Sequence, residues 1–176
     1  MYPFIRMFTE MARARRMTKL GLFEPHVSKV TCLPWDLDPW VELNNGRTLT
    51  LYDLGRLPLS RRTGFEALLR QKGWGLTVAG STTRYRRRVT VFMRLTMHTR
   101  CLGWDRRFLY MEQSMWRGDE CMSHVLIRSA VVSKAGMVPP ADMAVAMGVS
   151  PESPALPDWV QAWAEADVTR PWPPAR

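Results

Sequence analysis

The chain has 176 residues, of which 46% are hydrophobic, and a formal net charge of +9 at pH 7. That length fits one domain of ordinary size, and the apolar fraction excludes a wholly disordered chain. Residues 1–136 carry a net charge of +12, whereas residues 137–176 carry −3. A basic body of this kind indicates an anionic partner, a class that includes phosphates, nucleic acid, membrane surfaces and acidic ligands.

The spacing of the cysteines and the hydropathy of the chain indicate whether disulfides, a metal site or a membrane-spanning segment should be expected. Cys32, Cys101 and Cys121 lie far apart and form no CxxC pair, so the sequence predicts neither a disulfide framework nor a zinc site. Reduced cysteines favour a cytoplasmic protein, and we expect no metal and no cofactor. No apolar run approaches the roughly 20 residues that cross a bilayer, so we expect no transmembrane segment.

Residues 3–20 form the first predicted element. Ile5, Phe8, Met11 and Ala12 lie near helical spacing among arginines, which predicts a short basic amphipathic helix. One interpretation is a helix that docks on the surface of the domain, and the short apolar face favours it. The other is a segment that binds a membrane surface or regulates the protein.

A strand and a buried helix follow. Alternating apolar residues predict a strand over 27–35. Asn44-Asn45-Gly46 is a turn or helix-start signal, and leucines around the circumference of residues 47–57 predict a buried helix. Pro58 is expected to end that helix, because proline lacks the backbone N–H that the helix needs.

The middle of the chain is predicted to be β after a second short helix over 64–72. Strands are expected over 75–85, 89–98, 106–116 and 121–132, since each run is β-branched or alternates with a period of two. Short turns between them predict an antiparallel meander. The order of strand, buried helix and meander predicts an α+β domain in which one helix packs on a curved antiparallel sheet.

The chain is expected to have three parts. Residues 1–26 form a basic helical segment, residues 27–137 the globular domain, and residues 138–176 an extension rich in proline and tryptophan. Within that extension, residues 141–147 and 158–165 have helical character. The rest of it is expected to wrap the surface or to be partly disordered.

The densest polar cluster comes just before the buried helix. It comprises Asp36, Asp38, Glu42 and the pair Asn44-Asn45. Carboxylates beside tryptophans are costly to desolvate, and a carboxylate in such a place can act as a nucleophile or general base. The unpaired N–H groups at a helix start can hold a developing oxyanion. The alternative is ordinary capping, which Asp and Asn commonly provide.

The run DLDPWVELNNGR at residues 36–47 resembles the signature of hotdog-fold acyl-CoA thioesterases of the 4-hydroxybenzoyl-CoA thioesterase type. The runs STTRYRRR at 81–88 and LGWD at 102–105 look like two central strands of that family and their turn. The resemblance covers about residues 27–136. It implies a long central helix wrapped by an antiparallel sheet, and homodimers or dimers of dimers whose sheets pair edge to edge.

The resemblance also implies roles for single residues. Asp38 matches the acidic residue that many of these enzymes use as nucleophile or base, and Asn44 and Asn45 match the family's Asn pair. Glu42 stands where relatives usually have His. That departure implies either a shifted mechanism in which Glu42 shares the proton transfer, or catalysis lost from a retained binding fold.

The arginine run after residue 83 is the candidate phosphate site. On a strand, alternate side chains point to the same face, so three guanidiniums would line up for the nucleotide end of coenzyme A. Alternatives are a charged edge strand and a nucleic-acid site with Tyr85 stacking between arginines. The residues expected to bind substrate are Arg84, Arg86, Arg88, Trp40 and Tyr52.

The sequence therefore predicts an acyl-CoA thioesterase that releases free acid and coenzyme A. The alternative is a protein without catalysis, either a hotdog domain that binds acyl-CoA or a basic module that binds nucleic acid. Glu42 discriminates between the two, because it is a working replacement in the first and a relic in the second.

Overall fold

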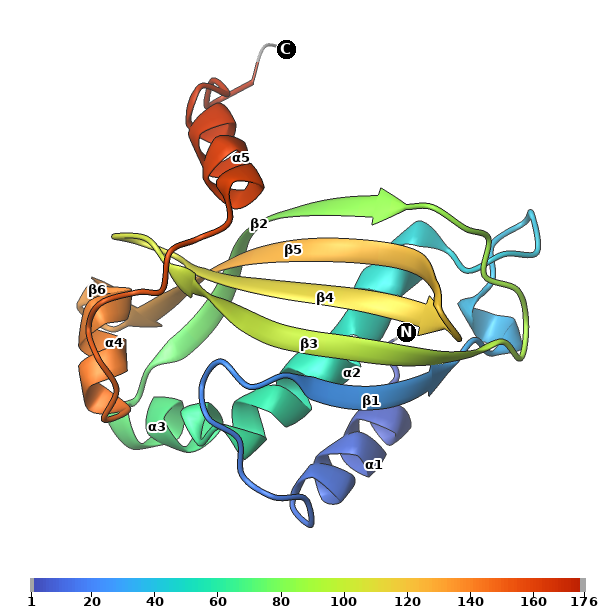
Figure 1. The fold of residues 1–176 in the computed structure, drawn as a ribbon, viewed down its shortest axis with the longest axis horizontal. Helices are drawn as coiled ribbons and strands as arrows, with labels where there is room; N and C mark the ends of the chain where they lie inside the picture. Colours follow the sequence, from blue (N-terminus) through green and yellow to red (C-terminus); the bar gives the residue numbers. More distant parts are fainter. Residues whose placement is uncertain (1, 175–176) are drawn as a thin grey trace.

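One curved antiparallel sheet wraps a long helix (Figure 1). The computed structural model describes residues 2–174. Met1 and residues 175–176, the outer ends of the predicted terminal segments, lie outside the described residues. The helices are α1 Phe4–Ala14, the 3-10 turn Pro34–Asp36, α2 Asn45–Arg62, α3 Phe65–Lys72, α4 Pro140–Ala146 and α5 Asp158–Val168. The strands are β1 His26–Thr31, β2 Gly75–Tyr85, β3 Arg94–Trp104, β4 Leu109–Arg117, β5 Glu120–Ser133 and β6 Gly136–Val138.

The strand order is β1-β3-β4-β5-β2, and β6 pairs with the end of β5. Three of the four strands predicted for the meander form it, namely β3, β4 and β5, with registers such as His98 opposite Ser114 and Ser114 opposite His124, whereas β2 does not pair with β3. β1 joins the β3 edge, and β2 returns to pair with β5. The predicted α+β architecture is confirmed, and β2 forms one outer edge of the sheet.

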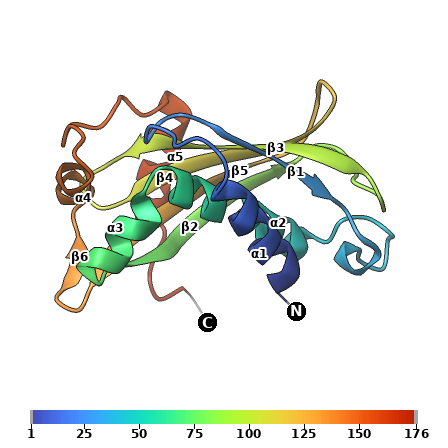
Figure 2. The same ribbon diagram turned by 90° about the horizontal axis from the view of Figure 1, so that it is seen from below.

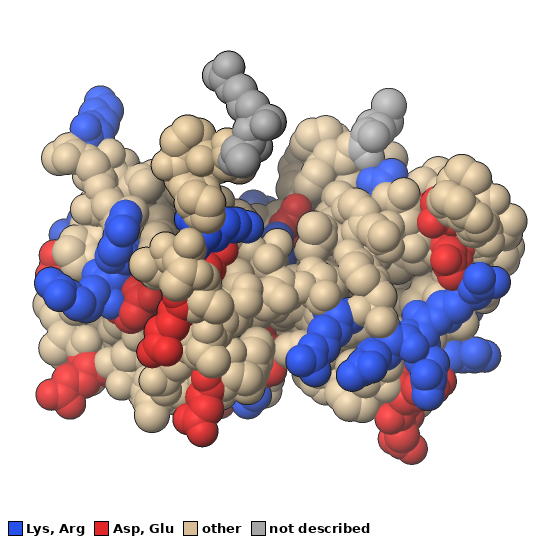
Figure 3. All heavy atoms as spheres, turned by 90° about the horizontal axis from the view of Figure 1, so that it is seen from above, with Lys and Arg blue, Asp and Glu red and all other residues tan. Residues whose placement is uncertain are grey.

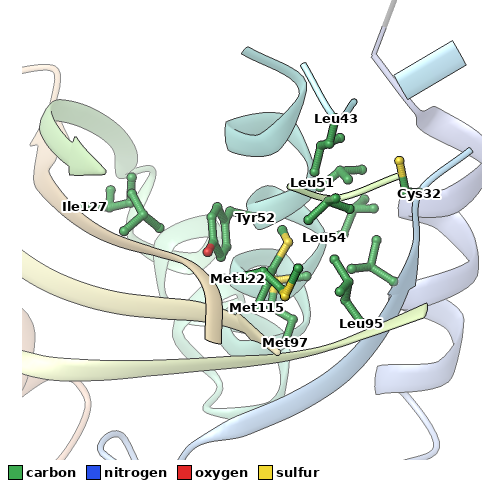
Figure 4. Close-up of a cluster of buried hydrophobic side chains, with 13 residues drawn as sticks. Cys32, Leu43, Leu51, Tyr52, Leu54, Leu95, Met97, Met115, Met122 and Ile127 are labelled. Atoms are coloured by element: carbon green, nitrogen blue, oxygen red, sulfur yellow. The ribbon is translucent and has the colours of Figure 1, made fainter. Parts of the chain in front are cut away.

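Helix α2 supplies the centre of the core. Leu51 and Tyr52 are fully buried on it and face methionines of the sheet, among them Met97 and Met115 (Figure 4). Methionine suits such a place because its flexible thioether fills irregular gaps. Helices α1, α2 and α3 lie on the concave side of the sheet (Figure 2).

The predicted end of the central helix at Pro58 is wrong. Helix α2 runs on to Arg62 with Pro58 inside it and buried. An internal proline costs about 3 kcal/mol because one backbone hydrogen bond is lost and the ring crowds the preceding turn. The residues beyond it, Leu59 and Arg62, are also buried, so packing of this last turn offsets that cost.

The predicted strand over 89–98 is also wrong at its start. Residues 90–93 form a turn, in which Phe92 has a φ of 61° and its N–H donates to Cys32 O at 2.7 Å. Strand β3 begins only at Arg94. The alternation of apolar and polar residues continues through this turn, so it could not indicate where the strand begins. The turn itself is fixed by hydrogen bonds with Cys32, far away in the chain.

Gly55 lets α2 approach the sheet. A Cβ at this position would lie 2.4 Å from Thr99 Oγ1 and 2.9 Å from Met97 Sδ. Alanine is the better helix former by about 1 kcal/mol, yet we expect Gly55→Ala to lower the free energy of unfolding by about 1–3 kcal/mol, because buried side chains must move. Urea unfolding measures the difference, and an unchanged or raised midpoint would contradict this account.

The C-terminal extension packs on the domain at two places. Met143 and Ala144 of α4 are buried in a cluster with α3. Val160 of α5 is buried against Tyr110 and Leu126, on the side of the sheet opposite α2. The two helical stretches expected from the sequence thus correspond to α4 and α5.

Candidate active site

The loop between β1 and α2 is built around Asp38. Its Oδ1 accepts hydrogen bonds from the N–H of Trp40 at 2.9 Å and of Glu42 at 3.4 Å. The Asp38 N–H in turn donates to Glu42 O at 2.8 Å. The Asp38 carboxylate is therefore half-buried and held in place, while the Trp40 side chain stands 74% exposed at the tip of the loop.

Asp36 is the fully buried carboxylate of the cluster. It is 1% exposed and forms ion pairs with Arg6 at 2.7 Å and with Arg47 at 3.1 Å. Two guanidiniums compensate the cost of burying one carboxylate. Asp36 thus ties α1 and α2 to the loop through its two ion pairs, which accounts for its burial without a catalytic role.

The start of α2 combines capping with open backbone donors. Asn44 is the N-cap, and its side chain accepts a hydrogen bond from Arg47 N at 3.0 Å. Asn45 is exposed, and its carbonyl accepts a hydrogen bond from the Tyr85 hydroxyl at 3.3 Å. The capping role is therefore real for Asn44, and the N–H groups of Asn45 and Gly46 remain at the positive end of the helix dipole.

A polar pocket of about 230 Å³ opens beside this helix start. Glu42 lies in it and forms an ion pair with Arg88 at 2.6 Å, so this carboxylate is engaged rather than poised as a free base. In Figure 3, basic atoms gather over this end of the molecule. The pocket is lined by Glu42, Leu43, Asn45, Thr48, Tyr85, Arg86, Arg87, Arg88, Val89 and Ser123.

The expectation that three arginines share one strand face is wrong. β2 ends at Tyr85, and the N–H groups of Arg86 and Arg87 both donate to Met122 O as the chain leaves the sheet. Arg84 alone of the three lies on β2, opposite His124 and outside the pocket. The structure thus brings Arg86 and Arg88 to the helix start and separates Arg84 from them.

A second, apolar cavity of about 500 Å³ lies under the C-terminal half of α2. Side chains of α2, α3, α4 and the sheet enclose it. Tyr52, which we predicted to contact the substrate, does not line this cavity. Its hydroxyl is buried elsewhere in the core and donates a hydrogen bond to Ser123 O at 3.0 Å. The apolar lining includes Leu22, Leu57, Leu59, Phe65, Leu69, Trp74, Leu76, Val78, Leu109, Met111 and Met143.

Asp53 and Arg56 are polar groups on the wall of this cavity that the sequence analysis missed. They form an ion pair, and Arg56 also donates to Gln113 Oε1 at 2.7 Å. Burial raises the pKa of the Asp53 carboxyl above its usual value, although Arg56 opposes the shift. Their opposite charges at i, i+3 in the middle of the helix, among Leu51, Tyr52, Leu54 and Leu57, were the signal that could have identified them.

The two sites are separate within one chain. Asn45 and Asp53 are eight residues apart on α2, which is about 12 Å along the helix axis. The polar pocket at the helix start and the apolar cavity share no lining residue, and Asp38 lines neither of them. No cluster of three or more His, Cys, Asp or Glu side chains suited to a metal ion is found within residues 2–174.

Comparison with known proteins identifies the family. The model of the thioesterase-like superfamily matches residues 32–164, which is most of the chain. The chain belongs to the thioesterase-like superfamily. The match includes the loop around Asp38, helix α2 and strands β2 to β6, and it extends into α5, whereas β1 lies just before it.

Individual relatives agree with this assignment. Protein THEM6 of Xenopus laevis is 33% identical over 102 residues, which cover 58% of this chain and 49% of that protein. The chain spans about half the length of the curated relatives it matches.

Solved structures show the same fold. The YbaW probable thioesterase of Escherichia coli has a TM-score of 0.64 at 13% identity, over 69% of this chain and 95% of that one. The DHNA-CoA thioesterase of Staphylococcus aureus has a TM-score of 0.60 at 12% identity, over 82% and 91%. The hotdog fold predicted from the resemblance is thereby confirmed.

Proposed function

We propose that this protein hydrolyses the thioester of an acyl-CoA to the free acid and coenzyme A. The observation that carries the proposal is the apolar cavity of about 500 Å³ under α2, in a member of the thioesterase-like superfamily. A cavity of this size and lining suits an acyl group. The basic pocket at the start of α2 suits the phosphates of coenzyme A.

In the proposed mechanism, Asp38 either attacks the thioester carbonyl and expels the coenzyme A thiolate, leaving an anhydride that water then hydrolyses, or removes a proton from a water molecule that attacks the carbonyl. In the second route the C–S bond breaks as the tetrahedral intermediate collapses, and the departing thiolate takes up that proton. Support comes from the half-buried carboxylate of Asp38, which the N–H groups of Trp40 and Glu42 hold in the loop that precedes α2. The N–H groups of Asn45 and Gly46 would hold the oxyanion that develops on the carbonyl. Asp53 is the second candidate, because it lines the acyl cavity itself and its raised pKa suits a group that exchanges protons.

A homodimer would reconcile the two separated sites. Leu76 and Val78 on the edge strand β2 are 38% and 55% exposed and also line the cavity. An apolar edge strand is suited to pair with another strand. We propose that two copies join there, or assemble further as dimers of dimers, so that the helix start of one copy serves the acyl cavity of the other.

A second candidate function is acyl-CoA binding without hydrolysis. The ion pair between Glu42 and Arg88 favours it, because this carboxylate is already engaged by a guanidinium in the pocket. In this case Glu42 replaces the histidine common in relatives without replacing its chemistry.

A screen of acyl-CoA thioesters, read as released free thiol, tests the proposed function. We expect turnover of at least one aliphatic or aromatic acyl-CoA. The double variant Asp38→Asn/Asp53→Asn is the control, since activity that survives in it comes from a contaminant or from other residues. Binding of an acyl-CoA without thiol release from any of them would establish the second candidate function instead.

Arg86→Ala is expected to raise the half-saturating concentration of acyl-CoA about tenfold or more, because a hydrogen bond to an ionised phosphate is lost. kcat should change little, since that contact lies away from the thioester and holds ground and transition states alike. Arg84→Ala is the matched control, because Arg84 lies on β2 outside the pocket. Equal effects of the two variants would place the nucleotide elsewhere.

A further inference from the structure

Helix α1 is fixed to the domain in one orientation. Arg6 on it donates to Asp36 Oδ2 and to Thr31 O, both at 2.7 Å. Ala14 is buried, and Met7 packs against the cluster of buried side chains that includes Leu51 and Tyr52 of α2. Figure 2 shows α1 lying beside α2. Because these contacts hold the helix, the opposite face of α1 is not free to turn inward.

That opposite face is apolar and uncovered. Phe4, Ile5 and Phe8 are 56%, 84% and 65% exposed. At 3.6 residues per turn these three side chains lie within an arc of about 100° on one side of the helix. A soluble surface exposes single hydrophobic residues routinely, but a contiguous stripe of two phenylalanines and an isoleucine marks a binding surface.

Cations follow the apolar stripe directly. Arg15, Arg16 and Lys19 are exposed just beyond the end of α1. The only acid between residues 2 and 20 is Glu10, and it is paired with Arg13 at 2.6 Å. The stripe and the cations together have the composition of a helix that lies in the interface of an anionic bilayer.

We propose that α1 and the segment to Lys19 form a docking face for an anionic phospholipid bilayer. The apolar side chains would enter the boundary between headgroups and acyl chains, and the cations would contact the lipid phosphates. The described residues contain no helix that is long and apolar enough to cross a membrane. Charge also disfavours a second copy at this face, because it would bring the same cations to it.

The first test is sedimentation of the full chain with phosphatidylcholine vesicles that do or do not contain phosphatidylglycerol. We expect binding to the anionic vesicles only, and release by salt, since exposed charges are screened beyond about 8 Å at physiological ionic strength. Ile5→Ser/Phe8→Ser should weaken binding about a hundredfold, at about tenfold for each buried side chain. The matched control is Val145→Ser/Val168→Ser, which changes valines that are 60% and 81% exposed elsewhere.

The second test reverses charge. Arg15→Glu/Arg16→Glu should weaken binding about twentyfold or more, because each cation near an anionic bilayer contributes about a fivefold factor. Arg106→Glu/Arg107→Glu, an exposed arginine pair in the turn before β4, should leave binding close to wild type. Circular dichroism confirms that each variant is folded.

Two outcomes would overturn the proposal. Equal binding by the α1 variants and their controls would mean that this face does not contact lipid. A change of sedimentation coefficient in Ile5→Ser/Phe8→Ser without lipid would assign the face to a second copy of the chain. Neither outcome depends on thioester hydrolysis, so the docking face and the proposed activity stand or fall separately.

Discussion

Asp38→Asn is expected to lower kcat for thioester hydrolysis by about 10²-fold or more, which is the scale of losing a general base. Asparagine keeps the shape of the side chain and the amide oxygen can still accept the hydrogen bonds from Trp40 and Glu42, so the loop should keep its conformation. Affinity for a non-hydrolysable acyl-CoA analogue should therefore persist. Steady-state kinetics and calorimetry measure the two quantities.

Asp53→Asn is the matched variant that assigns the chemistry. If Asp38 is the reacting group, Asp53→Asn should alter the half-saturating concentration more than kcat, because Asp53 lines the acyl cavity. A loss of kcat in Asp53→Asn but not in Asp38→Asn would identify Asp53 on α2 as the general base. In that case the acid limb of the pH profile of kcat/KM should lie above the range of an ordinary aspartate, since burial raises the Asp53 pKa.

The start of the central helix could be predicted because its determinants are local. Asn44 caps the helix with its own side chain, a contact that spans three residues. The end of this helix could not be predicted, because the turn that contains Pro58 is held by packing against distant parts of the chain. A distant contact also explains why β3 starts later than predicted, because the N–H of Phe92 donates to the carbonyl of Cys32, sixty residues earlier in the chain.

The residues of the candidate site also fall into those that local sequence predicted and those that depend on the packing of distant segments. The loop of Asp38 and Glu42 is a local structure, so its motif was visible in the sequence. Arg86, which we predicted to bind phosphate, lines the pocket at the start of α2, but from the loop after β2 rather than from the strand. Asp53 was missed because its role is defined by a cavity that forms only when α2 meets α3 and the sheet.

A buried histidine makes stability depend on pH. His26 is 2% exposed, and its Nδ1 lies 2.8 Å from the Arg62 guanidinium, which is also buried. Burial and then the positive charge of Arg62 lower the pKa of His26 from 6.5 to about 4 in the folded state. Between pH 6.5 and about 4 the His26 imidazole therefore stays neutral in the folded protein but is protonated in the unfolded chain.

The free energy of unfolding should therefore fall as pH drops from 6.5 to about 4. At 1.36 kcal/mol per pH unit this one group removes about 3 kcal/mol, and the loss should level off below its folded pKa. His26→Gln removes the titration, so the difference in stability between pH 7 and pH 4 should shrink by about that amount in urea unfolding. His98→Gln, at an exposed histidine on β3, is the control for carboxylates that titrate over the same range. Parallel pH curves for wild type and His26→Gln would show that His26 accepts its proton in the folded protein, and that the Arg62 contact opens to allow it.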